Sequence, residues 1–115
     1  MRLKASIWVS AYLRRLSAIP IPAVVTRRGD PDAGAIFIKI NMLDGHAQVF
    51  RPAATGVDDS ELERFWSLAT PGGKAEEAAA DAYLARQANF DSDMWVIEVE
   101  DREGRHFLGD FLISE

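Results

Sequence analysis

The sequence has 115 residues, of which 48% are hydrophobic, and its formal net charge at pH 7 is −5. This length and apolar content suit one packed core, so residues 1–115 are expected to form a single globular domain rather than a disordered chain. The chain has no cysteine. Disulfides, thiolate nucleophiles and cysteine-based zinc sites are therefore excluded, and a reducing compartment is indicated.

The charge is distributed unevenly along the chain. Residues 1–55 sum to +5, whereas residues 56–115 sum to −10. A partner will therefore meet two oppositely charged parts of the molecule. The same asymmetry predicts a weak homodimer that salt dissociates, because opposite charges on two copies attract each other until they are screened.

The first helix is predicted over residues 4–19, where the apolar side chains recur at helical spacing. Pro20 and Pro22 end it, since neither residue can continue a helix. A basic helix of this kind could lie on a membrane or on a partner, but we interpret its apolar arc as a core-packing face. The arc consists of Trp8, Ile19, Tyr12, Ala5, Leu16, Val9 and Leu13.

The beginning of the chain superficially resembles a secretory signal peptide. Its apolar stretch is interrupted by Ser10 and ended by Arg14 and Arg15, and no small-residue cleavage site follows. No apolar run reaches the length that a membrane span needs. We therefore expect a cytoplasmic protein without a membrane span.

Residues 23–51 are predicted to form an antiparallel meander with strands at 23–28, 35–42 and 47–51. The second strand alternates, with isoleucines on one face and polar or aromatic residues on the other. Its connection to the third strand contains an Asp-Gly pair, which is typical of a tight hairpin. The connection at 29–34 is rich in turn-forming residues.

Residues 62–69 leave two alternatives open. The spacing of Leu62, Phe65 and Trp66 fits a helix, and Ser60 with Glu63 would form a capping box. The Pro-Gly-Gly sequence that follows also fits the end of a strand. We favour a strand, because a meander precedes this segment.

The second half of the chain begins with a helix predicted over residues 74–90, which are almost entirely strong helix formers. A strand follows over 94–101, with Trp95, Ile97 and Val99 facing inward. A turn at 102–105 then leads to a last strand, from 106 to about 112. The fold class is therefore predicted as α+β, with an antiparallel sheet of four to six strands packed with two main helices, at about 4–19 and 74–90.

Four segments resemble a small family of short cytoplasmic alphaproteobacterial proteins, described as a domain of unknown function. They are Trp8-Val9 with Leu13–Arg15, the Arg-Arg-Gly-Asp-Pro-Asp-Ala-Gly sequence at 27–34, Leu43–Gly45, and Asp81–Arg86 continuing through Phe90–Leu108. The resemblance covers nearly the whole chain and implies no activity. The family pattern has proline where this chain has Ser92, which implies a looser loop at that position.

The strongest candidate ligand site is the segment that begins with Arg27 and Arg28. Neighbouring residues of a strand point to opposite faces, so one of the two guanidinium groups can clamp a phosphate or carboxylate. Asp30 and Asp32 in the loop could instead hold a divalent cation. We favour the simpler interpretation that both aspartates bond their own backbone in a hairpin turn, and we predict no metal site and no cofactor.

The two histidines, His46 and His106, lie in separate predicted hairpins and share no metal-ligand spacing. The sequence has no nucleophile elbow, phosphate loop or dinucleotide fingerprint. An enzyme would therefore have to use His106 with Asp30 or Asp32 as acid–base groups. A deep cleft that joins His106 to Asp30 would favour this alternative, whereas a flat surface would favour binding.

The sequence as a whole favours a non-catalytic cytoplasmic binding domain. We expect it to hold an acidic protein or an anionic ligand on a basic face centred on Arg27, Arg28 and the loop at 29–34. The candidate ligand-binding residues are Arg27, Arg28, Asp30, Asp32 and His106. The alternative is an enzyme that acts on a phosphorylated or anionic small molecule. Nucleic acid is the less favoured partner, because the isoelectric point is near 5.0.

Overall fold

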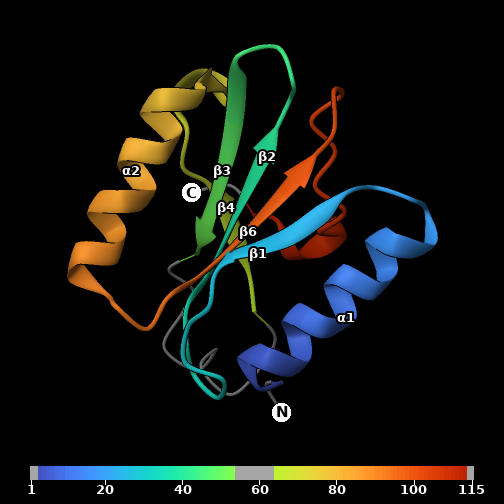
Figure 1. Cartoon of the computed structure of the whole chain (residues 1–115), viewed down its shortest axis with the longest axis vertical. Coiled ribbons are helices and arrows are strands. Elements are labelled where there is room, and N and C mark those ends of the chain that lie inside the picture. The colour runs from blue at the N-terminus through green and yellow to red at the C-terminus, as the bar shows by residue number, and fades with distance from the viewer. Residues whose placement is uncertain (1–2, 54–63, 114–115) are drawn as a thin grey trace.

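The computed structural model describes residues 3–53 and 64–113. Its centre is a mixed six-stranded sheet with two helices (Figure 1). The strands in sheet order are β1 (Ala23–Arg27), β6 (Trp95–Glu100), β2 (Ile36–Asn41), β3 (His46–Pro52) and β4 (Trp66–Leu68), with β5 (Ala75–Glu76) paired to β3. All pairs are antiparallel except β2 with β6. The predicted α+β class is confirmed.

The helices α1 (Ala5–Ala18) and α2 (Glu77–Phe90) cover opposite faces of the sheet (Figure 1). The alternation of β2 explains how: Ile36, Ile38 and Ile40 face α1, whereas Phe37 packs in the cluster beneath α2. Both faces of this central strand are buried. Neither helix in the described ranges is long and apolar enough to cross a membrane.

The prediction for Trp95, Ile97 and Val99 is confirmed. These residues belong to the same buried cluster as the inner side of α1. Trp95 is 1% exposed, and its Nε1 donates a hydrogen bond of 2.8 Å to the backbone oxygen of Asp30. The indole therefore joins the sheet to the loop that follows β1.

The predicted meander over residues 23–51 is wrong at its first step, because β1 pairs with β6 and not with β2. The connecting loop at 29–34 follows the beginning of β6 instead of turning as a hairpin. Asp30 N donates to Asp93 O at 2.8 Å. A Cβ at Gly29 or Gly34 would lie only 2.1 or 2.5 Å from that same oxygen. Glycine at both positions thus lets β6 enter the sheet between β1 and β2.

One predicted boundary needs revision, and one open alternative is resolved. The second helix begins at Glu77 rather than at residue 74, because Ala75 and Glu76 pair with β3. In the segment 62–69, the described part from Trp66 to Leu68 is strand, as favoured. Ser60, Leu62 and Glu63 lie outside the described residues.

The predicted last strand at 106–112 is wrong. Phe107 adopts a φ of 59°, in the left-handed region that bulky residues rarely enter. The carbonyl of His106 accepts a 2.7 Å hydrogen bond from the Tyr12 hydroxyl, and that of Phe107 accepts one from Arg15. These bonds turn the backbone toward α1. A short 3₁₀ helix, η3 (Gly109–Phe111), follows, and Leu112 forms a single bridge to Trp66.

We predict that Trp95→Ala lowers the free energy of unfolding by about 3–5 kcal/mol, because it empties a buried site and removes the bond to Asp30. Urea unfolding measures this change. Val24→Ala is the control, since Val24 is 58% exposed and should change stability by less than about 0.5 kcal/mol. A Trp95→Ala loss as small as that of the control would contradict the burial of the indole.

Candidate functional site

A groove lies between α1 and the C-terminal segment around η3. Its volume is about 270 Å³. One wall is a side of α1, on which residues spaced three, four and seven positions apart in the sequence lie next to one another. The other wall comes from the segment that replaces the predicted last strand. The lining residues are Leu3, Trp8, Ala11, Tyr12, Arg15, Leu108 and Phe111.

The helix wall of the groove is held by aromatic packing. The rings of Trp8 and Tyr12 stack with their centroids 4.9 Å apart and an interplanar angle of 18°. Trp8 also packs against Trp66, with 4.5 Å between the ring centroids. Trp66 is 1% exposed and anchored by its Nε1 on the backbone oxygen of Ile36. The wall is therefore a rigid continuation of the core.

The opposite wall depends on His106. Its Nδ1 accepts a 2.9 Å hydrogen bond from Leu108 N, which fixes the turn that places Leu108 and Phe111 in the groove. The imidazole packs edge-on against Phe50, with ring centroids 5.1 Å apart. Burial lowers the pKa of His106, which favours the neutral ring that this acceptor role requires. His106 thus shapes the wall from behind.

The rim of the groove is cationic. Arg14 and Arg15 are exposed on α1, and Arg15 lines the groove. The Tyr12 hydroxyl is engaged with His106, and burial raises the pKa of this phenol. Tyr12 is therefore neutral at physiological pH. Beyond Phe111 the groove continues into a more open hollow of about 340 Å³, which Asp110 also lines. The arrangement combines an apolar floor with positive charge at its edge.

The two predicted arginines lie elsewhere, beside the beginning of β6. Arg27 donates a 3.1 Å hydrogen bond from Nη2 to the backbone oxygen of Ser92. Arg28 is exposed, and its guanidinium lies 5.2 Å from the centroid of the Trp95 ring. Arg27 therefore supports the loop after α2, while Arg28 covers a core tryptophan.

The two predicted aspartates help to cap α1. Asp30 Oδ2 accepts hydrogen bonds from the backbone nitrogens of Asp32, at 3.1 Å, and Ala33, at 2.8 Å. The loop so formed offers the carbonyls of Pro31 and Asp32 to the first free N–H groups of the helix, at Ser6 and Ala5. The carboxylate of Asp30 therefore bonds its own backbone, as favoured, whereas the carboxylate of Asp32 lies 3.8 Å from Lys4.

The structure does not join His106 to Asp30. The carbonyl of His106 is bonded to Tyr12, in the middle of α1, whereas the loop of Asp30 bonds the first turn at Ala5. Across residues 3–53 and 64–113, no group of three or more His, Cys, Asp or Glu side chains is arranged to hold a metal ion.

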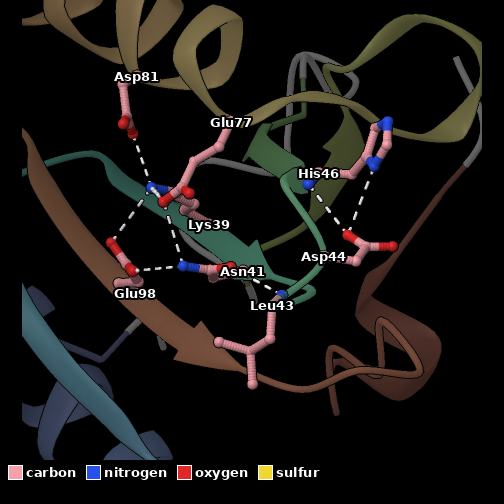
Figure 2. Close-up of polar contacts among 8 residues, drawn as sticks. All are labelled: Lys39, Asn41, Leu43, Asp44, His46, Glu77, Asp81 and Glu98. Atoms are coloured by element: carbon pink, nitrogen blue, oxygen red, sulfur yellow. Dashed lines mark hydrogen bonds and ion pairs between the residues drawn. The ribbon is translucent and has the colours of Figure 1, made fainter.

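A polar cluster surrounds the buried side chain of Lys39 on the other face of the sheet (Figure 2). The Lys39 side chain is 4% exposed and lies 2.8 Å from Glu77 Oε2 and 2.7 Å from Asp81 Oδ1, both on α2. Glu98 Oε1 of β6 is 3.4 Å away. Asn41 donates to both Glu77 and Glu98. One ammonium thus joins α2 to two neighbouring strands.

Electrostatics keep Lys39 charged. Burial disfavours the ammonium, but the hydrogen bonds to Asp81 and Glu77 and the charge of Glu98 outweigh it and raise the pKa of Lys39. A lysine nucleophile needs the opposite shift, toward neutrality at physiological pH. The cluster therefore serves to attach α2 to the sheet.

The groove is not evident from the sequence because it joins residues 3–15 to residues 108–111, which are distant in the chain. Trp8, Tyr12 and Arg15 share one side of the helix, but by spacing alone Trp8 and Tyr12 fit a core-packing face and Arg15 fits its solvated border. The opposite wall was predicted as a strand, so no concave surface was expected there.

Residues 3–109 match the family described as protein of unknown function DUF1491. The crystal structure of a DUF1491 family protein from Caulobacter crescentus CB15 has a TM-score of 0.79 and 39% identity, covering 99% of this chain and 100% of that chain. An NMR structure of a DUF1491 family protein from the same organism has a TM-score of 0.79 and 40% identity, covering 99% of both chains. The solution structure of Atu0922 from A. tumefaciens has a TM-score of 0.80 and 34% identity, covering 100% and 98%. No curated protein matches.

We predict that Lys39→Met lowers the free energy of unfolding by about 2–3 kcal/mol, because three carboxylates lose their shared cation. Asp81→Asn is the control and should cost less than about 1 kcal/mol, since Asp81 is 56% exposed. The folded pKa of Lys39 is raised, so its contribution is complete below the unfolded pKa of about 10.4 and is lost as the pH rises through the folded pKa. Urea unfolding should therefore show a constant difference from about pH 6 to 9, and a decrease at pH 7 would contradict the assignment.

We predict different effects for the two arginines. Arg27→Gln should lower stability by about 1 kcal/mol and accelerate amide exchange in residues 91–93, because the bond to Ser92 is lost. Arg28→Gln should cost about 0.5 kcal/mol, the usual value of an exposed cation–π contact, without altering that exchange. Equal exchange rates in the two variants would contradict a supporting role for Arg27.

Proposed function

Because the chain belongs to the DUF1491 family, which is described only as one of unknown function, we propose its role from the geometry of the groove. The protein is a non-catalytic binding module that holds an acidic protein segment. The partner inserts one apolar side chain between α1 and the C-terminal segment, and its carboxylates meet Arg14 and Arg15. The cytoplasmic location expected from the sequence is part of this proposal.

The observation that carries the proposal is the combination of size and lining. The part of the groove against α1 has a volume of about 270 Å³, which is below the roughly 300–1,000 Å³ of typical small-molecule sites, and the hollow that continues it is more open. The part against α1 is large enough for one aromatic or aliphatic side chain. Protein interfaces concentrate their binding energy in such anchors, which fill apolar pockets bordered by polar residues.

The cationic rim selects the kind of partner. Arg15 lines the apolar groove, and Arg14 is exposed next to it in the helix sequence. One N–H group of Arg15 is bonded to Phe107 O, and its other N–H groups could form charge-assisted contacts with carboxylates that flank the anchor. We place the contact on α1 because Arg15 lines the apolar groove, and its bond to Phe107 O uses only one of its N–H groups. Arg27 and Arg28 lie instead beside the loop after α2 and over Trp95.

The enzyme alternative has weaker support. Among the residues that line the groove, Tyr12 and Arg15 carry ionisable side chains. The Tyr12 hydroxyl is occupied and its pKa is raised by burial, whereas a general acid or base needs a pKa near the working pH. His106 and Asp30 contact different turns of α1. An anionic small molecule remains the second candidate ligand, since Arg15 could bind its charge.

We predict that a synthetic peptide with one phenylalanine between paired aspartates binds the protein with a Kd on the order of 0.1–1 mM, as one buried aromatic anchor implies. The resonance of the Trp8 indole N–H should shift during the titration, because Trp8 lines the groove. A peptide with alanine in place of phenylalanine should bind at least about tenfold more weakly.

Two helix variants localise the binding. Ala11 is exposed and lines the groove. The Ala11→Trp substitution should therefore fill the groove and weaken the binding of the peptide by at least about tenfold. Ala18→Trp, on the same helix but outside the groove lining, is the matched control and should bind like the wild type. Equal peptide affinity for all three proteins would overturn the proposal. Inorganic phosphate that shifts the Trp8 resonance and displaces the peptide would favour the small-molecule alternative instead.

A further inference from the structure

Phe90, the last residue of α2, is the most exposed large hydrophobic side chain among the described residues. It is 87% exposed. Asp91 follows it directly, and Asp93 lies two residues further on, exposed. An aromatic ring in water beside two carboxylates is the chemistry that the groove selects in a partner.

Hydrogen bonds hold the main chain of the segment that follows Phe90. Asp91 N donates to Gln87 O at 2.9 Å, and Asp93 N donates to Asp91 Oδ1 at 3.0 Å. Arg27 binds Ser92 O at 3.1 Å, and Asp93 O accepts from Asp30 N at 2.8 Å. A main chain that is already hydrogen-bonded loses little conformational entropy on binding, so the positions of Asp91 and Asp93 relative to Phe90 are set before contact.

Phe90 and the groove belong to opposite faces of the sheet, because α2 packs on one face and α1 on the other (Figure 1). The phenyl ring therefore cannot enter the groove of its own chain. A second copy can supply it. Such a contact is head-to-tail, since each molecule offers its anchor to one neighbour and its groove to another.

We propose that the groove of one copy of this chain binds Phe90 of a second copy, with Asp91 and Asp93 beside Arg14 and Arg15. The inference rests on the proposed function and names a partner for the same site. It also connects the two oppositely charged halves of the sequence, since the arginines lie in the +5 half and the aspartates in the −10 half. The contact is weak and sensitive to salt.

The first test is sedimentation of the full chain over a concentration series. The wild type should associate reversibly, and raising the salt from about 0.05 M to about 0.5 M should weaken association several-fold. Phe90→Ala should weaken it at least about tenfold. Val24→Ala removes another exposed apolar side chain (58%) and should change nothing. A dimer that Phe90→Ala leaves intact would overturn the inference and point to the edge strand β1.

The second test mixes two defective proteins. Phe90→Ala keeps its groove, and Ala11→Trp keeps its anchor, so each alone should be monomeric. Their mixture should form a 1:1 pair in which Phe90 of the Ala11→Trp protein occupies the groove of the Phe90→Ala protein. The pair cannot grow further, because its other groove is filled and its other anchor is absent. Substituting Ala18→Trp for Ala11→Trp should restore longer assemblies. A mixture that remains monomeric, while the wild type associates, would overturn the head-to-tail contact.

The outcomes separate this inference from the proposed function. If the acidic phenylalanine peptide binds the groove but the wild-type chain remains monomeric at millimolar concentration, the second copy is not the partner and the groove remains a binding site. If the Ala11→Trp protein binds the peptide normally and also self-associates normally, both the groove function and the inference fail.

Discussion

The structure depends on the contacts that Asp30 makes from the loop after β1. Its backbone nitrogen bonds Asp93 O, its backbone oxygen bonds the Trp95 indole, and its carboxylate folds the loop. Two carbonyls of that loop then cap α1. One short segment therefore fixes the start of β6, the end of the loop after α2 and the start of α1. The groove and the exposed Phe90 are both positioned through it, although they lie on opposite faces of the sheet.

Local patterns predicted the elements well, because their causes are local. The alternation in residues 35–42 identified the two faces of β2, and the composition of residues 74–90 identified α2 except for its first turn. The order of strands could not be obtained in this way. Whether residue 29 begins a hairpin depends on how closely its backbone approaches Asp93, 64 positions later, and composition carries no such information. Likewise, Tyr12 and His106 are 94 residues apart, and their hydrogen bond prevents the last strand.

The candidate site likewise has features that are visible in the local sequence and features that arise only from distant contacts. The sequence predicts a candidate ligand site or a hairpin turn at 29–34, whereas in the structure the glycines and aspartates there serve the packing of β6 and the capping of α1. A turn that caps a helix and a turn that binds an anion use the same residues and the same free N–H groups. In the structure, the hydrogen-bond partners of these N–H groups distinguish the two kinds of turn. The groove, in contrast, is made by side chains whose individual patterns are those of an ordinary core.

Some of the oppositely charged groups of the two halves attract one another within the fold, whereas others are exposed to solvent. Lys39, from the basic half, is enclosed by three carboxylates of the acidic half, so this attraction already holds α2 on the sheet. Lys4 lies near Asp32, and Arg27 is directed to the backbone of Ser92. Arg14 and Arg15 are exposed on α1, and Arg15 lines the apolar groove while one of its N–H groups is bonded to Phe107 O. Counting charges along the sequence cannot separate these groups, since burial decides which charges act within the fold and which can act on a partner. This distinction, more than the net charge, directs the binding proposal to α1.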